Sequence, residues 1–134
     1  MALEIKRREH EGIVILDLTG EIRAGDEAGQ FRDAVQGAAS SDGARVILNM
    51  AGIDYIDSTG LGAIVMSASR VNKTGGAVKL LNLSRRTIEL LVMTKLATIF
   101  EIFNDEQEAV NSFYPDRKIQ KFDILNFLQS HRES

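Results

Sequence analysis

Apolar residues in the first half of the chain follow a strand pattern, then a helix pattern and then a strand pattern again. Residues 3–9 and 12–20 are β-branched and apolar on either side of the turn His10-Glu11-Gly12, which predicts a β-hairpin. Residues 44–50 form a nearly continuous apolar run, typical of a strand covered on both faces. Between these strands, helical spacing predicts a helix that begins near Asp26. Four of its residues are expected to face the core: Ala28, Phe31, Val35 and Ala38.

The second half of the chain alternates helix and strand patterns. A helix is predicted from residue 58 to the glycines at 75–76, and another after Ser84, a favoured N-cap. Strands are predicted at 77–83 and 98–103, and Asn104 or Asp105 caps a last short helix. The residues expected on the inward sides of these three helices are Leu61, Ile64, Val65, Ala68 and Val71, then Ile88, Leu91, Val92 and Lys95, then Ala109, Val110 and Phe113.

Strands interleaved with helices predict an α/β fold in which helices cover a mixed central β-sheet. We expect one domain at residues 1–114 and a C-terminal extension at 115–134, because the composition changes after Pro115. The extension begins charged but then carries more apolar side chains than a free tail would: Phe122, Ile124, Leu125, Phe127 and Leu128. We expect it to form a helix that docks on this domain, or on a second copy of the chain in a homodimer.

Composition narrows the class of function. A chain of 134 residues with 44% hydrophobic residues fits one domain with a real core. The formal net charge of −3, with short and scattered basic runs, argues against direct nucleic-acid binding. The chain has no cysteine, which excludes disulfides and thiolate metal sites. Charged residues stand where the apolar region of a signal peptide would lie in MALEIKRREH, and no apolar run is long enough to cross a membrane, so we expect a soluble cytoplasmic protein without a signal peptide.

The segment IDYIDSTGLGAIVMSASR, residues 53–70, places an acid and two hydroxyls where a helix is predicted to begin. Asp57, Ser58 and Thr59 are all favoured N-caps, so an ordinary helix cap is one interpretation. A cap needs only one side chain, however, and here three follow one another. They also follow a buried strand, at the edge where ligand and regulatory sites of α/β sheets gather. This surplus favours a functional role.

A catalytic serine is the first functional alternative. It would need a base, but neither histidine, His10 or His131, is placed as in a serine hydrolase, and the G-x-S-x-G elbow is absent. The chain also lacks a phosphate-binding loop, a full dinucleotide fingerprint and a metal-ligand cluster. Asp54 and Asp57 are close in sequence, but paired acids in a loop are usually solvated. We therefore expect no enzymatic activity, no cofactor and no metal.

Regulated charge is the second functional alternative. A phosphoserine carries about −1.5 to −2 charges, which the exposed N–H groups and dipole of a helix start tolerate. A partner packed against that helix would instead meet a bulky dianion. A penalty of roughly 3–4 kcal/mol would weaken such a complex about a hundred- to a thousand-fold. That effect is large enough for a switch.

Three segments carry a family resemblance: LDLTGEI, VILNMAGIDYIDSTGLGAIV and GGAVKLLNLSRRTIELLVMTKLATIFEIFNDEQEAVNSF. Together they resemble a STAS domain, and more narrowly the stand-alone bacterial anti-sigma-factor antagonists, over about residues 3–114. The resemblance implies that the unphosphorylated protein binds an anti-sigma factor, which is itself a serine kinase, and thereby frees the sigma factor. Phosphorylation by that kinase ends the binding, and a phosphatase restores it.

The resemblance also implies roles for individual residues. Ser58 is implied as the phosphoacceptor and Asp57 as its neighbour in kinase recognition. The rest of the implied partner interface completes the motif and the first turn, where small residues allow close approach: Thr59, Gly60, Leu61, Gly62 and Ala63.

One position departs from the family pattern. Family members usually read T-G-E-[LI]-D, with the acid near the phosphorylation site, whereas this chain reads TGEIRAGD and has Arg23 there. Asp26 could replace that acid only if the loop rearranges. The departure, together with the apolar extension, favours an alternative in which the chain is a STAS scaffold or adaptor of a sensory or lipid-transport assembly. Ser58 would then be only a helix cap.

Overall fold

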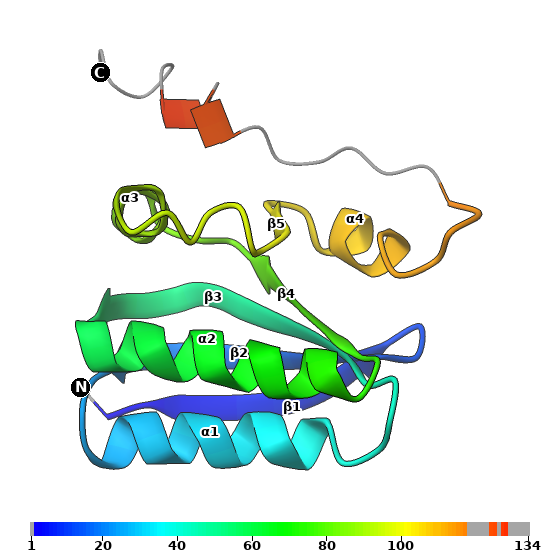
Figure 1. Cartoon of the computed structure of the whole chain (residues 1–134), viewed down its shortest axis with the longest axis horizontal. Coiled ribbons are helices and arrows are strands. Elements are labelled where there is room, and N and C mark those ends of the chain that lie inside the picture. The colour runs from blue at the N-terminus through cyan, green and yellow to red at the C-terminus, as the bar shows by residue number, and fades with distance from the viewer. Residues whose placement is uncertain (1, 118–123, 126, 129–134) are drawn as a thin grey trace.

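In the part of the chain that the structure describes, five strands form one sheet in the order β1-β2-β3-β4-β5 (Figure 1). The computed structural model describes residues 2–117, 124–125 and 127–128. β1 is antiparallel to β2, and the other neighbouring strands are parallel. The elements are β1 (Glu4–His10), β2 (Ile13–Ile22), α1 (Asp26–Ala38), β3 (Arg45–Ile56), α2 (Ser58–Lys73), β4 (Ala77–Leu81), α3 (Arg85–Met93), β5 (Ile102–Phe103) and α4 (Glu106–Asn111). The predicted α/β fold with a mixed sheet and an N-terminal hairpin is confirmed.

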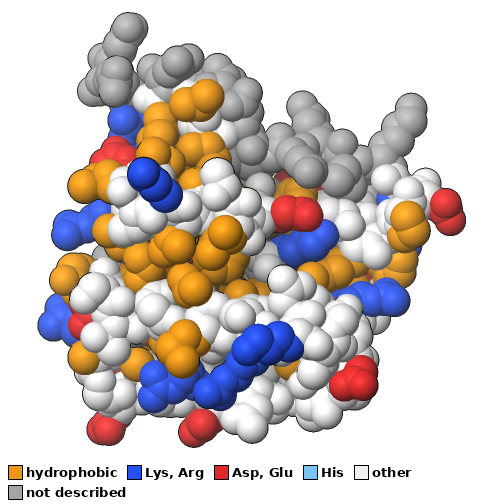
Figure 2. All heavy atoms as spheres, in the orientation of Figure 1, with side chains coloured by type: hydrophobic (Ala, Val, Ile, Leu, Met, Phe, Trp, Pro, Cys, Tyr) orange, Lys and Arg blue, Asp and Glu red, His pale blue; other side chains and the backbone are white. Residues whose placement is uncertain are grey.

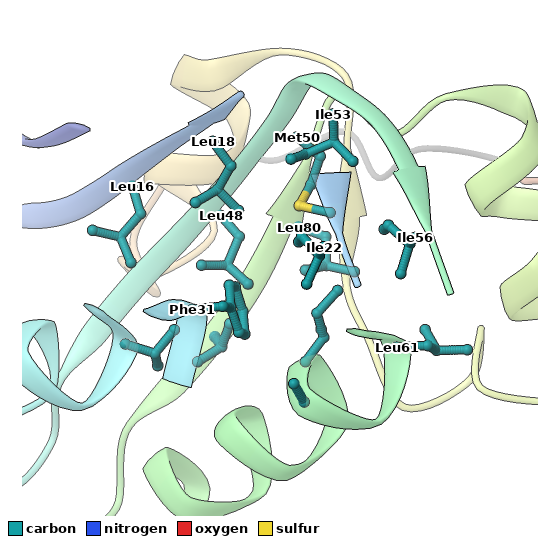
Figure 3. Packing of buried hydrophobic residues seen from close by; sticks show 14 of the residues in the cluster. Leu16, Leu18, Ile22, Phe31, Leu48, Met50, Ile53, Ile56, Leu61 and Leu80 are labelled. Carbon is teal, nitrogen blue, oxygen red and sulfur yellow. The ribbon is translucent and has the colours of Figure 1, made fainter. Parts of the chain in front are cut away.

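The main hydrophobic core lies between the sheet and the helices α1 and α2, which run side by side (Figure 1). Alternate residues of β2, among them Leu16 and Leu18, point into this core, as do the predicted inward residues of α1. Figure 3 shows Leu48 of β3 next to Phe31 of α1, and both side chains are fully buried. This packing fixes α2 against the sheet along its length, which in turn fixes the position of its first turn.

A smaller core covers the opposite face of the sheet. It is formed by Ile13, Ile15, Ile47, Leu81, Phe103, Ala109 and Val110. Buried Lys79 adds to this face, because its ammonium group donates to the backbone carbonyl of Ser112 at 3.1 Å and lies 4.3 Å from the centre of the Phe113 ring. With helices on both faces, β2, β3 and β4 are shielded from water as their near-continuous apolar sequences require.

An ion-pair network ties the N-terminal hairpin to α4. Arg8 bridges Asp17 at 2.6 Å and Glu106 at 2.5 Å, and Nδ1 of His10 lies 2.5 Å from Glu106. Hydrogen bonding to Arg8, reinforced by His10, lowers the pKa of Glu106 to about 2. The hydrogen bond to Glu106 raises the pKa of His10 above its ordinary value. Both groups therefore link stability to pH: the contribution of His10 is lost as the pH rises, and that of Glu106 as the pH falls.

Two predicted elements differ from the structure. The strand predicted at 98–103 is present only at Ile102–Phe103, because the chain is still turning where the N–H of Ile99 donates to the carbonyl of Leu96. α3 ends at Met93, and Lys95 has a left-handed φ of 63°. Val92 and Lys95, predicted to face inward, are therefore exposed, whereas Ile88 and Leu91 are buried as predicted.

The C-terminal extension is described only in part. Ile124, Leu125, Phe127 and Leu128 have helical backbone, and Ile124 packs on the main core while Leu125 is 70% exposed. Phe127 borders a hollow that also involves Ile88 and Phe103. Phe122 and the rest of the predicted helix lie outside the described residues, so the helix and a dimer through it remain predictions.

Candidate functional site

β3 runs six residues beyond the predicted strand and ends at Ile56, directly before the D-S-T-G segment. Its last residues stay paired with β2 up to Ile22 opposite Ile56. The backbone N–H of Asp57 continues this contact by donating to the carbonyl of Ile22 at 3.3 Å. The start of α2 is therefore fixed to the carboxyl end of the sheet.

Asp57 is the N-cap of α2. Its Oδ1 accepts a hydrogen bond from the backbone N–H of Gly60 at 2.7 Å, which satisfies one of the free donors of the first turn. Its Oδ2 accepts from the backbone N–H of Ala24, in the loop after β2, at 2.9 Å. These N–H groups, that of Ala24 first, lower the pKa of Asp57, and the charge of Arg23 adds to the effect. Asp57 is thus a carboxylate at neutral pH and already has a structural role.

Gly60 allows α2 to approach β2 closely. A Cβ atom at this position would lie 2.0 Å from the carbonyl oxygen of Ile22, a distance that no side chain tolerates. Leu61 and Ala63 point into the core and are almost completely buried. These three residues of the predicted interface therefore hold the helix in place, although Leu61 also borders a hollow beside Ser58.

Ser58 and Thr59 are exposed, and neither hydroxyl has a hydrogen-bond partner within the part of the chain that the structure describes. Because Asp57 alone supplies the cap, both hydroxyls are surplus to it, as the sequence pattern suggested. Gly62 follows one turn later, half-buried, with open space where a side chain would be. Of the predicted interface, Ser58 and Thr59 are exposed and Asp57 and Gly62 are half-buried, so these four residues are the most accessible to a partner.

A hollow of ≈ 430 Å³ lies beside Ser58, between the start of α2 and the outer side of α3. Its wall combines apolar side chains with charged ones: Tyr55, Ile56, Asp57, Ser58, Leu61, Arg86, Glu89, Leu90, Met93 and Thr94. Farther along α2, a second hollow of ≈ 400 Å³ includes Val65, Ala68 and Ile99. Figure 2 shows hydrophobic side chains gathered between α2 and α3 on this face.

We call this region the α2–α3 surface and define it by Ser58, Gly62, Val65, Met66, Met93 and Ile99. Ser58, Gly62 and Met66 succeed one another at four-residue spacing, so they lie on one side of α2. Met66, Met93 and Ile99 are 54%, 79% and 59% exposed. Met93 borders the first hollow and Ile99 the second, and exposed apolar side chains beside hollows are typical of a surface that binds another protein.

Arg23, at the position where the family pattern has an acid, contacts Tyr55 and Glu21 and forms no ion pair with Asp57 among the described residues. Its guanidinium lies 4.7 Å from the centre of the Tyr55 ring and pairs with Glu21 at 3.0 Å. Arg86 of α3 lies over the same ring at 5.6 Å. Asp26 is the first residue of α1, and its side chain forms no hydrogen bond or ion pair with any described residue.

Sequence reasoning missed Tyr55, Arg86, Glu89 and Met93. The signal was present in the topology, because β3 and β4 are parallel and adjacent, so the helices that follow them begin at the same edge of the sheet. The residues at the start of α3 must then lie near Ser58. Without knowing the strand order, this proximity could not be inferred.

Among the described residues, the one histidine does not lie near Ser58. His10 pairs with the first residue of β2, whereas Ser58 follows the last residue of the parallel strand β3, so the two lie at opposite ends of the sheet. His131 lies outside the described residues. Within the described ranges, no three His, Cys, Asp or Glu residues are grouped so as to hold a metal ion. No helix of the described part is long and apolar enough to span a bilayer.

The family model of the STAS domain matches residues 4–109 of this chain. The anti-sigma-B factor antagonist of Bacillus subtilis is 33% identical over 102 residues, which are 76% of this chain and 92% of that protein. An anti-sigma factor antagonist from Mycobacterium paratuberculosis has a similar structure, with a TM-score of 0.70 at 18% identity over 84% of this chain and 94% of its own. The phosphorylated form of the Bacillus cell fate determinant SpoIIAA has a TM-score of 0.62 at 21% identity, over 81% and 98%. These two structures are similar in fold, and the match to the family model over most of the chain shows that the chain belongs to the STAS domain family.

Proposed function

We propose that this chain is an anti-sigma-factor antagonist that is switched by phosphorylation of Ser58. In its unphosphorylated form it binds an anti-sigma factor, which is also a serine kinase, and so releases the sigma factor. The names of the relatives at 27–33% identity, which are antagonists of anti-sigma factors, support this assignment. The protein acts without a cofactor, in the cytoplasm, and does not contact DNA itself.

The observation that carries the proposal is the state of the Ser58 hydroxyl. It is exposed, has no hydrogen-bond partner among the described residues, and borders the hollow within the α2–α3 surface. The neighbouring Asp57 provides the cap, so Ser58 can change without loss of the helix start. A serine with a structural task would not be free in this way.

The chemistry of the switch follows from this placement. The Oγ of Ser58 bonds to the γ-phosphorus of ATP as ADP leaves, and the hydroxyl proton passes to the kinase. The product carries about −1.5 to −2 charges at the N-terminus of α2, where the helix dipole favours an anion. The fold is retained, but a partner that buries the α2–α3 surface must desolvate that dianion.

The roles of the neighbouring residues divide according to burial. Ser58, Thr59 and Gly62 contact the partner, with Met66 and Met93 providing apolar area. Asp57 accepts the hydrogen bonds that orient the loop after β2 and the first turn of α2. Gly60, Leu61 and Ala63 hold α2 against the sheet. A phosphatase that removes the phosphate from Ser58 completes the cycle.

The experiment uses the anti-sigma-factor kinases of the host, each purified and tested singly with the full-length chain. Binding is measured by calorimetry for the unmodified chain, Ser58→Asp and Ser58→Ala, and phosphorylation with Mg-ATP is mapped by mass spectrometry. We expect one kinase to bind the unmodified chain and to phosphorylate Ser58, and Ser58→Asp to abolish the binding. Ser40→Asp is the control. Ser40 is exposed in the loop between α1 and β3, so this substitution adds the same charge away from the α2–α3 surface.

A second candidate function is favoured by Arg23. In the scaffold alternative, the arginine at the position of the family's acid prevents kinase recognition, and the protein joins a sensory or lipid-transport assembly. Ser58→Asp would then leave partner binding unchanged, and no kinase would phosphorylate the chain. The same set of variants therefore separates the two functions.

A further inference from the structure

We propose that phosphate on Ser58 is bound within the same chain by the guanidinium groups of Arg86 and Arg23. The phosphate would then join α2, α3 and the loop after β2, and would fill the hollow beside Ser58. This inference rests on the proposed phosphorylation of Ser58 and adds the means by which the phosphate closes the partner surface.

Tyr55, which borders the same hollow as Ser58, contacts both arginines. The Cζ atom of Arg23 lies 4.7 Å from the centre of its ring, and that of Arg86 lies 5.6 Å from the same centre. Tyr55 and Arg86 both border the hollow that Ser58 borders. Two elements far apart in the sequence thus bring a cation each to one aromatic ring at the edge of one hollow. Cation–π contacts of this kind orient a guanidinium without neutralising its charge.

Arg86 is available to a new anion. Beyond its contact with Tyr55, it has no hydrogen bond or ion pair with any residue in the described part of the chain. Arg23 is partly engaged, through its pair with Glu21 at 3.0 Å. A planar guanidinium with free N–H groups binds phosphate oxygens in pairs, and such charge-assisted bonds are among the strongest in proteins.

The acids nearby are already paired. Asp57 accepts from the N–H groups of Gly60 and Ala24, and Glu89 accepts from Arg85 at 2.7 Å. Their charges oppose a phosphate, but their oxygens are directed at other donors. A third acid, Glu21, pairs with Arg23 at 3.0 Å, so Arg86 is the cation beside the hollow that has no ion pair in the described part of the chain, and the helix N-terminus adds a partial positive charge.

The same arrangement explains why Arg23 is compatible with a switch. An acid at this position would repel a phosphate on Ser58, whereas an arginine attracts it. Once bound, the phosphate would draw Arg86 across the hollow and cover the apolar wall formed by Leu90 and Met93. Phosphorylation would then act on the partner surface both by adding charge and by closing the hollow.

The test uses full-length chain with phosphoserine incorporated at position 58 during translation, so that no kinase is required. The second pKa of the phosphate, ordinarily about 6, is measured by ³¹P NMR in four backgrounds. These are the natural sequence, Arg86→Gln, Arg23→Gln, and Arg70→Gln as the control, because Arg70 is exposed near the other end of α2. Unphosphorylated versions of each variant are compared by thermal unfolding to show that the fold is intact.

We expect the phosphate pKa to lie below that of the urea-unfolded chain and to rise by about 0.5 unit or more in Arg86→Gln, with a smaller rise in Arg23→Gln. Arg70→Gln should leave it unchanged. If Arg86→Gln and Arg70→Gln give the same pKa, the inference is wrong. If Arg86 binds the phosphate but phosphorylation does not change partner binding, the proposed function is wrong and the contact between Arg86 and the phosphate still stands.

Discussion

The carboxylate of Asp57 accepts the backbone N–H of Ala24 at 2.9 Å while capping α2, so one side chain joins the loop after β2 to the helix that begins with Ser58. This contact keeps Arg23 and Ser58 at the same edge of the sheet. It also frees Ser58 and Thr59 from capping. Asp57 therefore fixes the position of the site, whereas the hydroxyls of Ser58 and Thr59 remain accessible.

Replacing Asp57 should weaken this junction. Asp57→Asn keeps the size of the side chain but replaces one accepting oxygen by a donor, so one of the two N–H groups, of Ala24 or of Gly60, loses its acceptor. We expect a lower midpoint of thermal unfolding and faster amide exchange at Ala24 or Gly60. Asp54→Asn, at an exposed position of β3, is the matched control and should change neither. Equal effects of the two variants would argue against the junction.

Gly60 and Gly62 should respond in opposite directions to the same substitution. Gly60→Ala forces a Cβ against the carbonyl of Ile22, and we expect it to lower the free energy of unfolding by about 3 kcal/mol. Gly62→Ala meets open space in the same helix and should raise it by about 0.5–1 kcal/mol through helix propensity. Urea unfolding of both variants measures the difference. A tolerated Gly60→Ala would mean that α2 does not approach β2 as closely as described.

Stability should fall on both sides of a window of pH because of His10 and Glu106. His10 has a raised pKa in the folded chain, so its contribution is complete below its ordinary pKa of 6.5 and is lost as the pH rises through the folded value. Glu106 has its pKa lowered to about 2, so its contribution is complete above 4.5 and is lost as the pH falls toward 2.

His10→Gln should remove the decline on the alkaline side. Urea unfolding between about pH 5 and 9 measures it, since an unfolded histidine titrates near pH 6.5. A decline of the same size in His10→Gln would show that another group causes it. Glu106→Gln should remove the acid-side decline and, through loss of its pair with Arg8, cost about 1 kcal/mol at neutral pH.

Met93 should matter for binding and not for folding. It is 79% exposed and borders the hollow beside Ser58, so Met93→Ser should change the free energy of unfolding by less than about 0.5 kcal/mol. Affinity for the anti-sigma factor should fall about tenfold, or 1.4 kcal/mol, as expected for an anchoring side chain. Gln36→Ser on α1, outside the α2–α3 surface, is the control. Unchanged affinity in Met93→Ser would exclude Met93 from the interface.

Local pattern was sufficient for most of the fold. The inward residues of α1 and the cap at Ser84 were predicted because each depends on spacing or on a side chain within one turn. The end of α3 was not, since Val92 continues a helical stripe although Lys95 adopts a left-handed backbone that terminates the helix. The prediction of a strand at 98–103 was too long for the same reason, because the first of these residues belong to the turn after α3.

The candidate site was predictable where it is continuous in sequence. Asp57, Ser58 and Thr59 could be identified from the surplus of capping side chains. Which of them caps, however, depends on the N–H of Ala24, thirty-three residues earlier. The contribution of Arg86 depends on the strand order, and the burial of Leu61 and Ala63 depends on which side of α2 meets the sheet. Tertiary placement, which a local pattern does not contain, decided these three points.

The affinity of the cognate anti-sigma factor for the chain carrying phosphoserine at position 58, compared with the unmodified chain, tests the central proposal most directly. Calorimetric titration at physiological salt would measure both, with phosphoserine at position 40 as the control for added charge. We predict an affinity at least about a hundredfold lower with phosphate on Ser58 and unchanged with phosphate on Ser40. Equal affinities for all three proteins would contradict the account of Ser58 as the switch.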